Sequence, residues 1–106
     1  MSYPFDPGQD FIDVIDGLEP VTYEYRQNRE VFTEPNVMAL FHRPIADEPN
    51  NAGQIMGIFH IRASDITFNA KARDRIIRAD FTIWVVVDYH LESFLQRYRF
   101  NCHKAV

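Results

Sequence analysis

The chain has 106 residues, of which 46% are hydrophobic and 25% are charged, and its formal net charge is −4. This length suits one domain with a single core, and the composition excludes a mainly disordered chain. The longest apolar run, residues 81–87, is far shorter than the roughly 20 residues that span a bilayer. The lone cysteine, Cys102, cannot form an intrachain disulfide. We therefore predict one domain over residues 1–106, without a membrane span, in a reducing compartment.

The first predicted element is a short amphipathic helix at about residues 10–18. Four apolar residues recur there at helical spacing: Phe11, Val14, Ile15 and Leu18. Gly17 and Pro20 are expected to end the helix. Its expected role is to cover one open end of a barrel or sheet.

From Val21 the hydrophobic period changes to two, which is typical of half-buried strands. Pro35 interrupts the segment after residues 31–33, so strand pairing there is expected to be at an edge or broken, because proline lacks the N–H that a sheet ladder needs. Strands are predicted over residues 21–25, 31–33, 37–42, 55–62, 75–78, 81–91 and 94–103, and residues 66–69 also alternate. The fold class that follows is mainly β, a small antiparallel β-barrel or sandwich built as a meander, with the short N-terminal helix and one long loop.

The long loop covers residues 43–54, which contain two prolines, a glycine and two asparagines. A loop of this length in a small domain is often functional. Two interpretations stay open, a passive hairpin insertion and a partner-binding loop. The candidate binding residues in it are Arg43, Ile45, Asp47, Glu48, Asn50 and Asn51.

The longest predicted strand, residues 81–91, is apolar on both sides. One face is predicted to hold Ile83, Val85, Val87, Tyr89 and Leu91, and the other Trp84 and Val86. Such a strand needs cover from a helix, a second sheet or another subunit. In the last strand, Cys102 is in phase with Phe94, Tyr98 and Phe100, so we predict that it is a core residue. The opposite face is predicted to hold Arg97, Arg99, Asn101 and His103.

No catalytic or metal motif occurs in the chain. The four histidines and Cys102 lack the close pairwise spacing of a structural zinc site. We therefore expect no metal, no cofactor and no enzymatic activity. An enzyme would require a deep pocket lined by His60, His90 and nearby acidic residues.

The charge is uneven along the chain. Residues 1–60 hold ten acidic residues against three arginines, a net charge of −7, whereas residues 61–106 hold eight basic residues against five acidic ones, a net charge of +3. The two halves either attract each other within one fold or join different copies in a ring, since a head-to-tail interface joins two different patches. Both interpretations stay open at this stage.

From Ile61 onward, several short motifs occur in a characteristic order. These are Ala63-Ser64-Asp65-Ile66, Asp74-Arg75-Ile76, Trp84 with Val86, and Leu95 followed by Arg97-Tyr98-Arg99 and Cys102. In these motifs the sequence resembles the C-terminal half of the small head–tail joining proteins of tailed phages and prophages, also called stopper, neck or head-completion proteins. The resemblance covers less than half of the chain.

The resemblance implies a structural β-barrel protein of the virion. It would form a homo-oligomeric ring between the portal or adaptor protein and the tail terminator or tail tube, and would continue the channel through which phage DNA passes. Its expected location is the head–tail interface, and the bacterial host cytoplasm during assembly. The arginines expected to contact a neighbouring subunit or the channel are Arg73, Arg75, Arg78, Arg97 and Arg99. The alternative is a non-catalytic binding module of another bacterial assembly, with residues 43–54 as its recognition loop.

Overall fold

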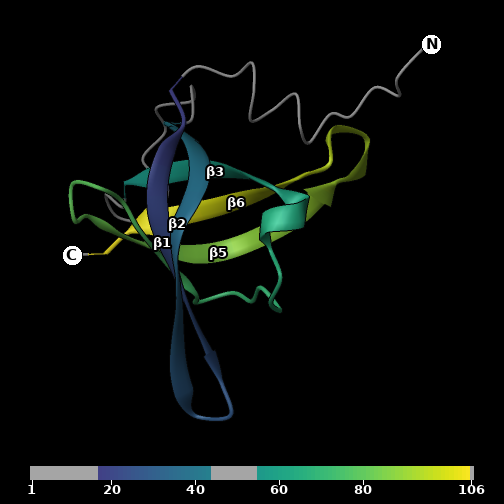
Figure 1. Ribbon diagram of the computed structural model, residues 1–106. Helices are drawn as coiled ribbons and strands as arrows, with labels where there is room; N and C mark the ends of the chain where they lie inside the picture. The colour runs from purple at the N-terminus through teal and green to yellow at the C-terminus, as the bar shows by residue number, and fades with distance from the viewer. Residues whose placement is uncertain (1–16, 44–54, 106) are drawn as a thin grey trace.

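The computed structural model describes residues 17–43 and 55–105, which form a closed barrel of six antiparallel strands (Figure 1). The strands are β1 (Glu19–Gln27), β2 (Glu30–His42), β3 (Met56–Arg62), β4 (Arg75–Ile77), β5 (Ile83–Glu92) and β6 (Arg97–Lys104). Two single-turn 3-10 helices, η1 (Ala63–Asp65) and η2 (Ser93–Leu95), interrupt them. The predicted mainly-β barrel is confirmed. The predicted helix lies outside the described residues except for its last two, Gly17 and Leu18, which are not helical.

The strand order around the barrel is β1-β2-β3-β6-β5-β4. Strands β1–β3 form one three-stranded meander and β4–β6 form another, and the two are joined along β3–β6 and β1–β4. The predicted single meander is therefore correct within each half of the chain but wrong at the junction, where β3 pairs with β6 instead of β4. No membrane-spanning helix occurs in residues 17–43 or 55–105.

The two strands predicted on either side of Pro35 form one strand, but the predicted break in pairing at Pro35 is confirmed, because neither Pro35 nor Asn36 has a register partner in β1. Strand β2 runs without a break from Glu30 to His42, and its register against β1 shifts between Val21 and Tyr23. Asn36 takes up this irregularity with a positive φ of 60°. A proline is tolerated where the ladder is already interrupted by a bulge.

A second irregularity, in β5, changes which residues face the core. The register against β6 shifts between Val86 and Asp88, so that Val87 is the extra residue. Trp84 and Val86 are buried, and beyond the bulge Tyr89 pairs with the buried Phe100. The prediction of one apolar face from Ile83 to Leu91 is wrong, because the extra residue inverts the alternation halfway along the strand.

The barrel interior is filled mainly by aromatic and β-branched side chains. The buried cluster comprises Val21, Tyr23, Val37, Ala39, Phe59, Ile61, Ala70, Ile76, Trp84, Val86, Phe100 and Cys102. Cys102 is fully buried, as predicted, and burial raises the pKa of its thiol. Gly57 makes room for two rings, since a Cβ built there would lie 2.5 Å from Phe41 and 2.7 Å from Trp84.

The segment between η1 and β4 has no strand, so the alternation of residues 66–69 predicts the wrong structure. It instead packs aromatic and polar side chains onto β1. The Phe68 ring stacks on Tyr25 with centroids 4.5 Å apart, and the Tyr23 hydroxyl donates a 2.6 Å hydrogen bond to the buried Asp74 carboxylate. This segment therefore tethers the second half of the chain to β1.

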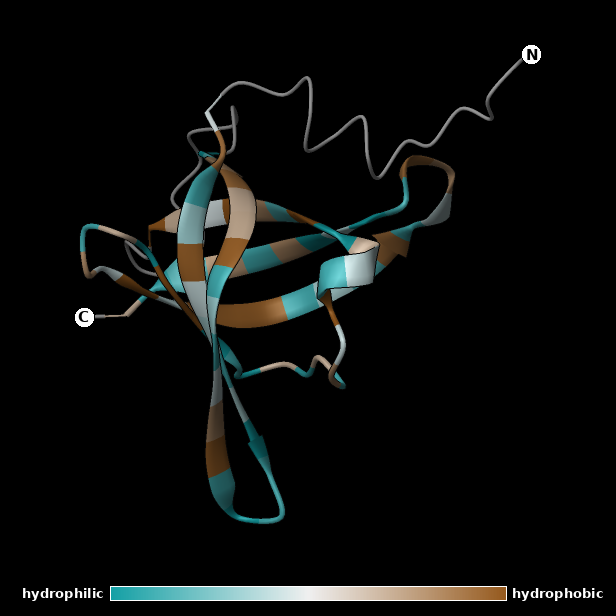
Figure 2. Ribbon diagram, in the orientation of Figure 1, coloured by the Kyte–Doolittle hydropathy of each residue, from teal (hydrophilic) through white to brown (hydrophobic). Residues whose placement is uncertain are grey.

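Two hairpins extend beyond the barrel wall. We call residues 25–33 the β1–β2 arm and residues 88–97 the β5–β6 arm. In Figure 1 the first runs down from the barrel and the second projects to the right. The β1–β2 arm turns at Asn28 and Arg29, whose positive φ values of 53° and 67° are those of a type I′ turn. Figure 2 shows apolar residues on both arms, where one strand has only its hairpin partner beside it.

Candidate functional site

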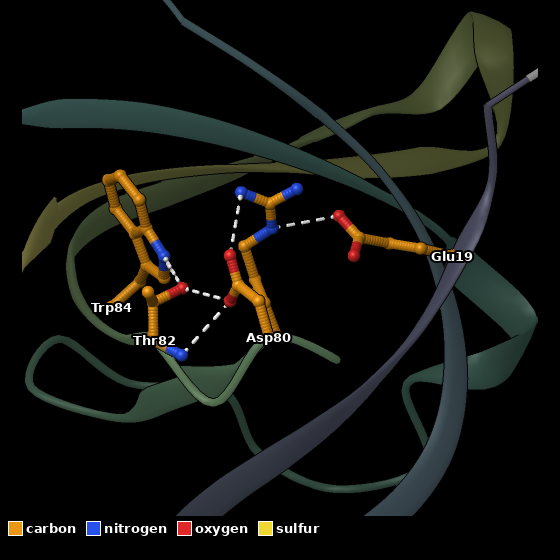
Figure 3. Close-up of polar contacts among 5 residues, drawn as sticks. Glu19, Asp80, Thr82 and Trp84 are labelled. Atoms are coloured by element: carbon orange, nitrogen blue, oxygen red, sulfur yellow. Dashed lines mark hydrogen bonds and ion pairs between the residues drawn. The ribbon is translucent and has the colours of Figure 1, made fainter.

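Arg78, one of the five candidate contact arginines, is half-buried and makes its contacts within the protein. Its Nε donates a 2.9 Å hydrogen bond to Glu19, and its guanidinium lies 4.1 Å from the centre of the Phe41 ring. Figure 3 shows Asp80 on its other side, with Thr82 linking Asp80 to the Trp84 indole. Because these contacts join β1, β2 and β4, Arg78 is positioned to stabilise the fold rather than to meet a partner.

Arg73 and Arg75 lie on the surface at the start of β4. Within the described parts of the chain, no hydrogen bond or ion pair holds either guanidinium. The Arg73 backbone, with a φ of 76°, donates a 2.7 Å hydrogen bond to the Val86 carbonyl. This bond fixes Arg73 beside β5 at the point where β4 pairing stops. Of the five arginines, these two are the most available for contact with another molecule.

Arg97 and Arg99 project from the outer face of β6, as the alternation predicted. Arg97 donates a 2.9 Å hydrogen bond to Glu92, and Arg99 donates a 3.3 Å bond to Asn101. Strand pairing places Arg99 between His60 of β3 and His90 of β5. The outer face of β3, β5 and β6 therefore carries mixed charges that are partly neutralised within the chain.

His60 is the buried polar residue of this outer face. Its Nε2 lies 3.0 Å from Nε2 of His42, and its Nδ1 lies 3.6 Å from the Glu92 carboxylate. Burial, with the nearby cation Arg97 and the His42 ring, lowers the pKa of His60 to about 4. At neutral pH this imidazole is uncharged, and its protonation opposes folding.

The histidines lie apart from the described cleft. In the parts of the chain that the structure describes, His60 and His90 share one cross-strand row on the outer face of the barrel. A cleft of about 410 Å³ lies elsewhere, between the irregular part of β2 and η1. Its lining residues are Glu34, Pro35, Asn36, Val37, Met38, Arg62, Ser64, Asp65 and Thr67. Among residues 17–43 and 55–105, no three histidine, cysteine or acidic side chains are grouped so that they could hold a metal ion.

The predicted partner-binding loop falls mainly outside the described residues. Of its candidate residues only Arg43 is described, and it lies exposed just after β2. Ile45, Asp47, Glu48, Asn50 and Asn51 lie outside the described ranges, so their role as binding residues stays a prediction.

The sequence interpretation missed the exposed apolar residues of the two arms. Val31 and Leu91 are 50% and 47% exposed, and Phe94 at the end of the β5–β6 arm is 83% exposed. Alternation alone assigns such residues to a core, because it does not indicate where a strand runs past the end of a barrel. The available signal was the Asn28-Arg29 pair between two strands, which marks the outer end of a hairpin.

Comparison of the chain with models of known protein families and with curated proteins found no match.

Proposed function

We propose that this protein is a structural head–tail connector of a tailed phage or prophage. Copies of the barrel form a ring between the portal or adaptor protein and the tail, and the ring continues the DNA channel. The chain acts through its surfaces and catalyses no reaction. The motifs from Ala63 to Cys102 that resemble head–tail joining proteins motivate this assignment.

One observation carries the proposal: a small closed barrel presents two arms whose apolar side chains are exposed. A soluble monomer gains nothing from exposed Phe32, Leu91 and Phe94, whereas a subunit of an assembly covers such residues with its neighbours. The guanidinium groups of Arg73 and Arg75, which have no partner among the described residues, supply charged contacts beside β5. Exposed apolar arms beside exposed arginines are typical of a subunit that assembles with other copies or partners.

The test is electron-microscopy localisation of a tagged copy in phage particles from the source of the gene. The proposal predicts density at the neck between capsid and tail, and predicts that deletion of the gene leaves separate heads and tails. Intact particles in the deletion strain, with the tagged protein absent from every particle, would contradict it.

The cleft beside η1 favours a second candidate function, a non-catalytic binding module. It combines the carboxylates of Glu34 and Asp65 with the guanidinium of Arg62, which donates a 2.9 Å hydrogen bond to Asp65. These groups would suit a polar peptide segment. Loss of peptide capture in an Asp65→Ala variant, with neck localisation absent, would favour this second function.

A further inference from the structure

Strand β2 has an open edge over most of its length. Strand β2 pairs with β1 on both sides of the irregularity at Pro35 and Asn36, but it pairs with β3 only from Ala39 to His42. Residues 30–38 therefore have no paired strand on that side among the residues that the structure describes, and residues 34–38 line the cleft beside η1. An open edge of this kind presents backbone N–H and C=O groups to any strand that can lie beside it.

Strand β5 has a second open edge on another side of the barrel. It pairs with β4 only from Ile83 to Val85, and Val86 then exchanges backbone hydrogen bonds of 2.7 and 2.8 Å with Arg73 and Asp74. From Val87 to Glu92, the described chain offers only β6 as a neighbour. Both open edges lie along the arms.

The register shows which backbone groups point outward along β5. Val86, Tyr89 and Leu91 pair with Cys102, Phe100 and Tyr98, which are every second residue of β6. Since the Val86 groups point away from β6, those of Tyr89 and Leu91 do so as well.

The same alternation applies to β2. The residues that flank the type I′ turn, Gln27 and Glu30, form a hydrogen-bonded pair, so the pair of Arg26 with Val31 and the pair of Glu24 with Thr33 are not hydrogen-bonded. The backbone groups of Val31 and Thr33 therefore point away from β1, toward the open edge.

The two edges also match in side-chain chemistry. Val31 and Phe32 are exposed on β2, and Val87, Tyr89 and Leu91 are exposed on β5. Residues 30–38 contain Glu30 and Glu34 and no lysine or arginine. The open part of β5 contains Asp88 and Glu92, and Arg73 lies beside its start at Val86. The apolar side chains of the two edges can pack on each other, and Arg73 supplies a cation for the glutamates of the β2 edge.

We infer that the open edge of β2 in one copy pairs with the open edge of β5 in the next copy, so that neighbouring barrels share a continuous sheet. This is a heterologous contact between two different edges, which generates rings or open filaments according to the rotation between copies. Backbone hydrogen bonds supply the affinity, and the alternate apolar side chains supply the fit. The inference deepens the proposed connector function and rests on its premise that the chain acts as a multimer.

The test uses two variants, each with one blocked edge. Thr33→Pro removes an outward N–H from β2, and Leu91→Pro removes an outward N–H from β5, while the hydrogen bonds to β1 and β6 are kept. Thr33→Ala and Leu91→Val retain the N–H and are the matched controls. Leu91→Lys is a second block that leaves the backbone intact, because lysine on an edge strand opposes pairing.

Circular dichroism first shows that each variant is folded. Sedimentation velocity at high protein concentration then measures the oligomeric state of each variant and of the mixture. We expect each blocked variant to be monomeric alone and an equimolar mixture of the two to form a heterodimer, because the mixture contains one intact edge of each kind. A mixture that stays monomeric would overturn the inference, and so would either blocked variant dimerising alone.

Neck localisation distinguishes this inference from the proposed function. Neck density together with a monomeric mixture would retain the connector function and reject the edge pairing. A heterodimer together with absence from particles would retain the edge pairing and reject the connector function.

Discussion

The barrel wall and the two arms are built from the same alternating strands, yet they bury their side chains to different extents. In the wall each strand has two neighbours, and inward residues such as Phe59 and Phe100 are fully buried. In the β1–β2 arm each strand has only the other beside it, and in the β5–β6 arm β5 has only β6 beside it among the described residues. Phe32 and Leu91 there are 39% and 47% exposed. Whether an alternating apolar residue is buried or exposed therefore depends on the number of strand neighbours around it. Substitutions in the wall should change the unfolding free energy, and substitutions on the arms should change association.

The largest expected effect is at Gly57 in the wall. A Gly57→Ala substitution places a Cβ 2.5 Å from Phe41 and 2.7 Å from Trp84, two rings that pack inside the barrel. We expect a loss of about 3 kcal/mol in the unfolding free energy, because overpacking forces buried groups to move. Urea denaturation measures this loss. Thr33→Ala on the β1–β2 arm is the control and should change stability by less than about 0.5 kcal/mol. Equal effects at both positions would remove the distinction between wall and arm.

The next effect is a pH dependence that arises from His60. Its pKa is about 4 in the folded chain and about 6.5 in the unfolded chain, so folding is favoured above pH 6.5 and is progressively opposed as the pH falls toward 4. The expected loss of stability across this window is about 3 kcal/mol. Urea denaturation at several pH values measures it.

The contribution of His60 can be isolated by substitution. A His60→Gln variant should lose most of the dependence between pH 6.5 and 4, whereas His90→Gln, at an exposed position in the same cross-strand row, should retain it. An unchanged profile in His60→Gln would show that another group is responsible.

A smaller effect is expected at Tyr23, whose hydroxyl donates to Asp74. Removal of this hydroxyl in Tyr23→Phe leaves a buried carboxylate with one donor fewer and should cost about 2 kcal/mol. Burial raises the pKa of Asp74, and the hydrogen bonds from Tyr23 and from the Lys71 backbone oppose that rise. Tyr25→Phe is the matched control, since its ring stacks on Phe68 and its hydroxyl has no described hydrogen bond. Thermal denaturation that ranks the two variants equally would contradict the assigned role of the hydroxyl.

The smallest expected effect distinguishes two arginines of β4 and its turn. Arg78→Ala loses the Glu19 contact and the Phe41 ring contact, and should lower stability by about 1 kcal/mol. Arg75→Ala should have almost no effect on stability, because its guanidinium is exposed and without a described partner. Chemical denaturation of both variants measures the difference. A larger loss for Arg75→Ala would place that side chain in the fold instead of at an interface.

Much of the wall could be predicted from the sequence, and the arms could not. Strong alternation predicted β1, β3 and β6 within two or three residues, and it assigned Cys102 to the core. The bulge at Val87 could not be predicted, because a single extra residue leaves no mark in an apolar run that is hydrophobic on both faces. For the same reason, apolar residues on the arms were indistinguishable from core residues until the barrel closure was known.

The candidate arginines also show that a local sequence pattern does not indicate which residues meet in the fold. Sequence treats Arg73, Arg75 and Arg78 alike, since they lie close together in a basic segment. The fold separates them, because Arg78 faces Glu19, which is 59 residues away in the chain, whereas Arg73 lies beside an open strand edge. Contacts between residues so distant in sequence are set by strand order, which local patterns do not encode.

Hydrogen exchange tests the contrast between wall and arms most directly. The experiment compares the Thr33→Pro and Leu91→Pro variants alone with their equimolar mixture, with one variant isotopically labelled at a time. We predict that amides of residues 87–92 become protected in the Thr33→Pro variant and amides of residues 30–36 in the Leu91→Pro variant, while amides of the wall keep their protection unchanged. Slower exchange throughout the wall with none in the arms, or no change anywhere, would contradict the assignment of the arms to association.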